Sequence, residues 1–329
     1  MRTVVQVGIV MADGLTDTDR LAILVVYLVR DDELALLRLH LDRIERHTSI
    51  PYTLYACTNR TTPEATAAIR AAPNVVICDV ESTDERGSRE HAYYLDAMMA
   101  RARADGATHV VTLDVDSFPI DDRWVDVLVA AMPDESGVAA ILRVENGDTV
   151  LPHPSCTMLR RDFLDRYEPS FSPDSDMTPE FRRFLRTTQQ AGDTGIRIGY
   201  TLTSGQLPWG KLLRTNVVDV HYLMAGVYAD VVFHLGAGAR ATLFRKDLER
   251  SRVHRVTEPI ARIRTRREST RRFKHRVLAR ARTRSENRFI RANEQIAAQI
   301  RASLRDDPDG FLAYLRGGEN RGFPPEQRG

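Results

Sequence analysis

The chain has 329 residues, of which 43% are hydrophobic and 28% charged, as in a soluble globular protein with one large domain or two ordinary ones. Its longest clean apolar run, Leu21–Val29, is too short for a membrane span, and its 3 separated cysteines exclude a disulfide framework and a Cys-x-x-Cys metal site. The net charge is only +2, but the segment from Arg250 to Arg291 holds sixteen basic and three acidic residues, which leaves about −11 on the remainder. We therefore predict a cytoplasmic protein with an acidic body and a basic appendage. Met1–Ala12 is only a weak match for a signal peptide.

The first hundred residues after Arg20 alternate between short apolar runs and amphipathic segments. The runs predict strands at Leu21–Val29, Tyr52–Cys57, Val75–Val80 and Val110–Leu113. The segments between them predict helices at Glu33–His47, Glu64–Ala72 and Glu90–Ala104. This alternation predicts a mostly parallel α/β sheet that is flanked by helices and joined by right-handed crossovers.

The rest of the chain shows a mixed pattern. Further helices are expected at Arg123–Met132, from Arg161, and at Thr178–Ala191. Further strands are expected at Gly137–Leu142, His153–Leu159, Arg197–Leu202 and Tyr228–Leu235. Three parts result: an α/β domain over residues 1–245, a basic helical extension over 246–304, and a C-terminal tail over 305–329 that frays from Arg321.

Two carboxylates, Asp114 and Asp116, follow the apolar run Val110–Leu113. Side chains two apart on a strand point the same way, so both carboxylates are expected to face one site at the carboxyl end of the sheet. Hard oxygen donors there suit Mg²⁺ or Mn²⁺, which in turn neutralises a diphosphate. The duller interpretation is a solvated acidic turn.

Several pieces in a fixed order resemble a family 2-type glycosyltransferase, whose nucleotide-sugar-binding fold is called GT-A. The resemblance covers roughly Leu21 to Arg245. Its pieces are a polar turn at Asn59, Gly87-Ser88-Arg89-Glu90, Val111-Thr112-Leu113-Asp114-Val115-Asp116-Ser117, Gly192-Asp193-Thr194-Gly195 and Val232-Phe233-His234-Leu235-Gly236.

The resemblance implies a metal-dependent, inverting transfer of a sugar from a nucleoside-diphosphate donor to an acceptor hydroxyl. Asp116 and His234 would bind the Mn²⁺ or Mg²⁺ ion, and Asp193 would be the general base. Asn59, Arg89 and Asp114 would contact the donor, with Asp114 near its ribose.

Each of these residues also has a structural interpretation. His234 fits a structural histidine at a strand end, and Asn59 fits an Asx turn. Arg89 fits a helix cap or a pair with the neighbours of Glu90. Asp193 fits a turn, and because Gly192 precedes it where the family often has an acid, Asp174 or Asp176 would serve as the base. His153-Pro154-Ser155 either lines the acceptor side or enters a strand.

Other functions were weighed against this one. A sugar-nucleotide nucleotidyltransferase would need an N-terminal Gly-rich loop, which the sequence lacks, and Gly236–Ala241 matches the dinucleotide fingerprint outside its required strand–turn–helix setting. A non-catalytic adaptor would use the Arg-rich extension. For that extension we rank packing against its own domain or a second subunit first, an anionic membrane surface second, and nucleic acid a distant third.

Overall fold

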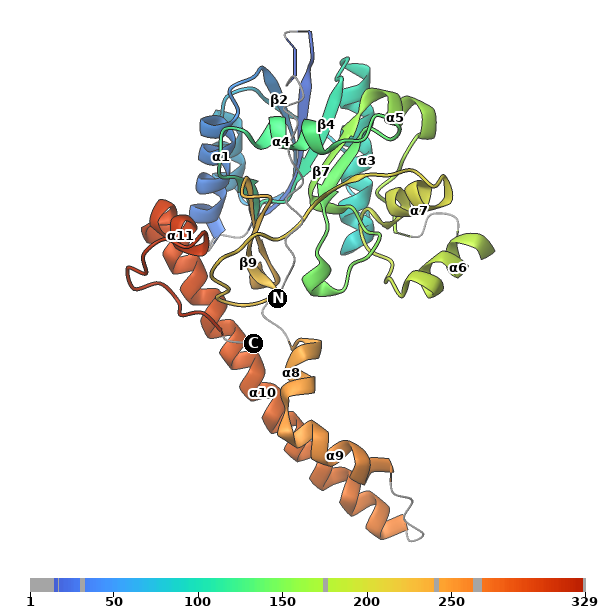
Figure 1. The fold of residues 1–329 in the computed structure, drawn as a ribbon, viewed down its shortest axis with the longest axis vertical. Coiled ribbons are helices and arrows are strands. Elements are labelled where there is room, and N and C mark those ends of the chain that lie inside the picture. The colour runs from blue at the N-terminus through green and yellow to red at the C-terminus, as the bar shows by residue number, and fades with distance from the viewer. Residues whose placement is uncertain are drawn as a thin grey trace, which may run out of the picture.

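The computed structural model describes residues 15–16, 18–29, 33–173, 177–239, 243–262 and 268–327. A seven-stranded sheet with the order β3-β2-β1-β4-β7-β6-β8 forms the centre of the molecule (Figure 1). All of its neighbouring strands run parallel except β7, which is antiparallel to both β4 and β6. The predicted class, a mostly parallel sheet flanked by helices with a C-terminal helical extension, is confirmed.

The large sheet consists of β1 (Leu21–Val29), β2 (Tyr52–Thr61), β3 (Val75–Ile77), β4 (His109–Leu113), β6 (Val138–Ile141), β7 (His153–Arg160) and β8 (Gly210–Leu212). A second, three-stranded sheet has the order β5-β10-β9 and consists of β5 (Ser117–Pro119), β9 (Met224–Tyr228) and β10 (Val232–Gly236). The body helices are α1 (Leu34–His47), α2 (Pro63–Ala71), α3 (Ser88–Ala104), α4 (Trp124–Ala131), α5 (Arg161–Tyr167), α6 (Pro179–Thr188) and α7 (Ile196–Ser204).

Alternation along β1 explains how helices cover both faces of the large sheet. Leu21, Ile23 and Val25 point into a core cluster with α1, α2 and α4. Ala22 and Leu24 point into the opposite cluster, with α3, α5 and α7. A strand that is buried on both faces reads as a continuous apolar run, which is why the sequence pattern located β1 correctly.

The segment predicted as a strand at Arg197–Leu202 is a helix, α7. Its apolar residues lie on two sides of the helix: Ile196 packs against α6, and Ile198 and Leu202 pack against the main sheet. This spacing resembles the alternation of a strand. The hydroxyls of Thr201 and Thr203 donate to carbonyl oxygens four residues earlier, as in a helix.

The strand predicted at Tyr228–Leu235 is a hairpin in which β9 precedes β10. Its turn places Ala229 and Asp230 at φ of 48° and 61°, a left-handed conformation for which the sequence offers no glycine signal. Asn59, predicted to lie in a turn, is part of β2, which continues to Thr61.

The basic C-terminal segment forms α8 (Arg245–Arg250), α9 (Arg252–Arg262) and α10 (Glu268–Asp306), followed by α11 (Pro308–Leu315). The later part of α10 packs through Ala297, Ile300 and Leu304 on the three-stranded sheet, together with Phe311 of α11. The earlier part forms an arm with α9 that extends away from the body (Figure 1).

The chain after α11 is held against the body, so the expectation of fraying from Arg321 is wrong up to Gln327. The Tyr314 hydroxyl donates to the carbonyl oxygen of Pro324 at 3.2 Å, and the Gln327 amide donates to that of Asp219 at 2.8 Å. The division of the chain into three parts stays a prediction. Among the described residues, no helix is long and apolar enough to cross a membrane.

The three cysteines are buried free thiols, yet two of them are neighbours in space. Ala56 pairs with Ile77 across β2 and β3, so the next residues, Cys57 and Cys78, lie side by side. Both pack in the same core cluster. Their separation in the sequence concealed this proximity.

Candidate functional site

The two carboxylates of the Asp-x-Asp motif lie directly after β4. Asp114 is half-buried and Asp116 is buried, and both belong to a turn that leads into β5. The turn is closed by the Ser117 amide, which donates to the carbonyl oxygen of Asp114 at 2.9 Å. The alternation of a strand therefore does not place these side chains, although they remain close enough for Asp114 to raise the pKa of Asp116.

Asp114 belongs to a group of three side chains that could hold a metal ion. The others are His153, the first residue of β7, and His234, in the middle of β10. One ligand atom from each residue lies within 4.8 Å of those of the other two. In Figure 1, β4 and β7 are neighbours in the large sheet, and the three-stranded sheet lies beside them.

Alternation along β10 explains why His234 points to this place. Phe233 and Leu235 pack with α10 and α11, so the side chain between them is directed to the opposite side of the small sheet. There the ring centroid of His234 lies 5.3 Å from that of His153. Across the strand pair, His234 is opposite Ser117, the residue that follows Asp116.

Both imidazoles are neutral at physiological pH. Burial lowers the pKa of His234 to about 3, and the positive charges of Arg143 and Arg214 add to the effect. Burial also holds the pKa of His153 well below its ordinary value, again with Arg143 contributing. Neutral imidazole is the form that binds metal ions.

The hydrogen bonds of the two rings differ. Nδ1 of His153 lies 2.7 Å from the hydroxyl of Ser155, a contact that fixes the ring. Nδ1 of His234 is buried and has no hydrogen-bond partner among the described residues. Its Nε2 lies 3.8 Å from Oδ1 of Asp116. A buried ring nitrogen without a partner is costly, and a nearby cation would remove that cost.

The surroundings of Asp116 disfavour its charged form. Burial, followed by repulsion from Asp114, raises its pKa to about 8, while the positive charge of Arg301 on α10 acts in the opposite direction. On the other side of the motif, Nε2 of His91 lies 3.5 Å from Oδ1 of Asp114. A divalent ion beside the two carboxylates would balance the charge of Asp114 and favour the charged form of Asp116.

Asp193 is held in place by α3, the helix that also contacts Asp114. Its Oδ1 accepts hydrogen bonds from the Ser88 hydroxyl at 2.6 Å and from the Thr194 amide at 2.8 Å. Ser88 and His91 are three residues apart on α3, so they share a helix face. Because His91 reaches Asp114, this face links the two carboxylates.

A second connection runs through the buried Asp148. Arg143, which acts on both histidines of the group, pairs with Asp148 at 2.9 Å. Burial raises the pKa of Asp148, and the charge of Asp193 raises it further, so Asp193 lies near this ion pair. Oδ2 of Asp193 accepts no hydrogen bond from any residue that the structure describes.

Asn59 and Arg89 were predicted to contact the sugar donor, and in the structure each contacts a residue outside the group of Asp114, His153 and His234. Nδ2 of Asn59, near the end of β2, donates to the carbonyl oxygen of Val80, in the loop after β3, at 2.8 Å. Arg89 pairs with Glu85 at 3.6 Å. The donor roles of Asn59 and Arg89 therefore stay predictions.

Arg89 lines a surface cavity that is also lined by Gly192, the residue before Asp193. The cavity has a volume of about 530 Å³, and its lining residues are Asp84, Glu85, Arg86, Ser88, Arg89, Pro173, Met177, Leu185 and Gly192. The alternative bases Asp174 and Asp176 lie outside the described residues.

Sequence reasoning missed His91 and Arg143, and it assigned His153 only to the acceptor side or to a strand entry. His91 follows the Gly87–Glu90 piece directly, and one more residue along α3 would have included it. No local pattern marks Arg143, because its relation to the two histidines arises only from the sheet order.

No family model and no curated protein matches the chain. Similar solved structures include the mannosyltransferase PcManGT from Pyrobaculum calidifontis in complex with GDP-Man and Mn²⁺, at 16% identity and a TM-score of 0.41 over 91% of this chain and 79% of that one. Mouse xyloside xylosyltransferase 1 is similar at 14% identity and a TM-score of 0.38, over 59% and 84%. The galactosyltransferase LgtC in complex with donor and acceptor sugar analogs is similar at 11% identity and a TM-score of 0.35, over 59% of this chain and 73% of that one. Scores in this range do not establish a shared fold, so the functional argument rests on the residues of the site.

Proposed function

We propose that the chain is a metal-dependent glycosyltransferase that moves a sugar from a nucleoside-diphosphate donor to an acceptor hydroxyl, with inversion. The observation that carries this proposal is the convergence of Asp114, His153 and His234 within 4.8 Å at the edge of the main sheet. The order of the sequence pieces, which resembles family 2-type glycosyltransferases, supports it independently.

The donor set favours Mn²⁺ over Mg²⁺. Mg²⁺ binds oxygen ligands, whereas two neutral imidazole nitrogens beside a carboxylate suit a transition metal. The buried Nδ1 of His234, which lacks a partner among the described residues, supports the fit. We propose Asp114, His153 and His234 as the ligands, in place of the predicted pair Asp116 and His234. Asp116 would then be a carboxylate adjacent to the ion.

When bound, the ion would neutralise the negative charge that develops on the departing nucleoside diphosphate. Arg143 and Arg214 add positive charge on the same side, since both lower the pKa of His234. Arg301 adds positive charge from α10, since it lowers the pKa of Asp116. Arg143 and Arg214 also pair with Asp148 at 2.9 Å and with Asp219 at 2.8 Å, so these ion pairs offset part of their charge.

Asp193 is proposed to be the general base. Ser88 and Thr194 hold its Oδ1, so Oδ2 is left to take the proton from the acceptor hydroxyl. The acceptor oxygen then bonds to the anomeric carbon while the bond from that carbon to the diphosphate oxygen breaks. A single displacement of this kind inverts the configuration at the anomeric carbon.

The test is a thermal-shift screen of nucleoside diphosphates and nucleotide sugars, with Mn²⁺, with Mg²⁺ and with chelator. A ligand that binds only the folded state raises the unfolding temperature, so the effective nucleotide identifies the donor. We expect stabilisation with Mn²⁺ to exceed that with Mg²⁺, and we expect it to be lost in Asp114→Asn.

Asp134→Asn is the matched control, because Asp134 is fully exposed and the substitution removes the same charge. If Asp114→Asn retains the Mn²⁺-dependent shift of the control, the metal assignment is wrong. If no nucleotide stabilises the wild type in any metal, the proposed donor class is wrong.

A further inference from the structure

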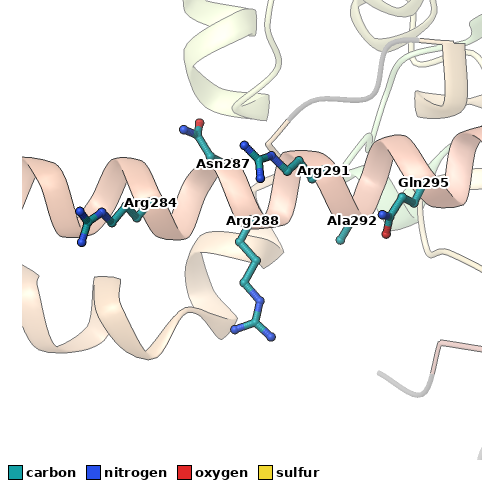
Figure 2. Close-up of a pocket in the computed structure, with 6 residues that line it drawn as sticks. All are labelled: Arg284, Asn287, Arg288, Arg291, Ala292 and Gln295. Carbon is teal, nitrogen blue, oxygen red and sulfur yellow. The ribbon is translucent and has the colours of Figure 1, made fainter.

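One face of α10 collects basic side chains that the proposed reaction does not use. Arg284, Arg288 and Arg291 are exposed, and their spacing of four and three residues puts them on a single helix face. With a rise of about 1.5 Å per residue, they span roughly 10 Å along the helix. Figure 2 shows the three side chains extending from successive turns of α10.

The opposite face of α10 is occupied by its own chain. Arg282 donates to the Thr257 hydroxyl at 2.9 Å, Ser285 lies 2.9 Å from Ser251, and Asn293 donates to Asp247 at 2.9 Å. These contacts attach α10 to α8 and α9. The arginine face is therefore turned away from the packed side of the arm.

The three arginines line a shallow groove of about 420 Å³. Its lining residues are Arg284, Asn287, Arg288, Arg291, Ala292 and Gln295. The described lining residues include three arginines and no acidic side chain. Groups with negative charge are the complementary ligands.

Exposed apolar side chains accompany the arginines on the arm. Val277 is 48% exposed and lies seven residues before Arg284, which places it on the same face of α10. Val256 of α9 is 61% exposed. Basic side chains beside an exposed apolar one, as Arg284 beside Val277, suit a helix that lies in a membrane interface, where the charges meet lipid phosphates and the apolar group enters the acyl boundary.

We propose that this face of the arm, Val277 to Gln295 on α10, docks the protein on an anionic phospholipid surface. The earlier part of α10 extends away from the body together with α9, which leaves room for a flat surface there (Figure 1). Phospholipid phosphates supply the complementary charge, and neither the metal group nor Asp193 takes part. The proposal is therefore independent of the glycosyltransferase assignment.

The experiment is co-sedimentation of the full-length protein with vesicles of phosphatidylcholine alone or mixed with phosphatidylglycerol. The wild type should bind only the mixed vesicles, and binding should weaken with added salt. The variant Arg284→Gln/Arg288→Gln/Arg291→Gln should bind about 100-fold more weakly, since each charge near the surface contributes about fivefold.

The matched control is Arg182→Gln/Arg183→Gln/Arg186→Gln, which removes three exposed charges from α6 on the body. It should bind like the wild type, and circular dichroism should show both variants folded. Equal binding by the two triple variants, or equal binding of wild type to both vesicle types, overturns the proposal. The proposal is also overturned if the protein does not bind vesicles and the three arginines are instead needed for a dimer or for a complex with nucleic acid.

Discussion

The metal group and the arginine face of α10 both concentrate charge, but they do so in different physical settings. Asp114, His153 and His234 come from the turn after β4, from β7 and from β10, and both histidines are buried. The arginines come from consecutive turns of one exposed helix. Charges in the buried group interact strongly and depend on strict geometry. Charges on the exposed helix interact weakly, over a range that salt shortens.

The contrast teaches which kind of function each region can support. Buried, convergent ligands can fix one ion at one place and can therefore support catalysis. An exposed stripe attracts many polyanions with little geometric demand, so it suits attachment to a surface. Substitutions in the two regions should accordingly differ in size, in salt dependence and in the property they change.

The largest effect is expected at Asp193. Asp193→Asn removes the proton acceptor, so turnover should fall by about 10²–10⁴-fold while donor affinity stays unchanged. Ser88→Ala, which removes one hydrogen bond to Oδ1, should reduce turnover by about tenfold. Steady-state kinetics with the donor found in the thermal-shift screen measure both. Unchanged turnover in Asp193→Asn would move the base to another residue.

A smaller effect is expected on stability at Asp116. Its pKa is raised from 3.8 to about 8 in the folded protein, so the folded state binds a proton that the unfolded state has lost. Stability that this group contributes at low pH should therefore be lost as the pH rises from about 4 to 8 and stay level above that.

Asp116→Asn removes this titration. Without metal, the unfolding free energy of the wild type relative to the variant should fall with pH by no more than about 1.4 kcal/mol per unit. Urea unfolding in the presence of chelator, repeated across this pH range, makes the measurement. A difference that stays constant with pH would show that Asp116 is ionised in the metal-free protein.

The smallest effect is expected from the arm. Substituting Arg284, Arg288 and Arg291 with Gln should change turnover on a soluble acceptor by less than about twofold, because the three side chains are exposed and salt screens exposed charges. The assay is run without vesicles at physiological ionic strength. A large loss of turnover there would mean that the arm takes part in the reaction itself.

The sequence predicted the main sheet well, because its signals are local. The apolar run at Leu21–Val29 and the helical spacing at Leu34–His47 are explained by burial of these same segments. The prediction failed at α7, whose apolar residues pack in two different core clusters. It also failed at the turn of Ala229 and Asp230, where residues other than glycine adopt a left-handed conformation.

Of the three proposed ligands, Asp114 was located from its place after a strand, His234 was named only through the family resemblance, and His153 was not identified as a ligand. Asp114 and Asp116 are adjacent to a clear strand, so their place at the sheet edge could be inferred. The partnership of His153 with His234 depends on β7 inserting antiparallel beside β4 and on β10 pairing with β5. Such long-range pairings leave no periodic signal in one sequence.

The measurement that tests the central claim most directly is pulsed electron paramagnetic resonance of Mn²⁺ added to the full-length protein. The account predicts tight binding of one ion with couplings from two imidazole nitrogens. His153→Gln and His234→Gln should each remove one coupling, and Asp114→Asn should weaken binding while leaving the fold intact. An ion surrounded only by oxygen ligands, with no change in either histidine variant, would contradict the account.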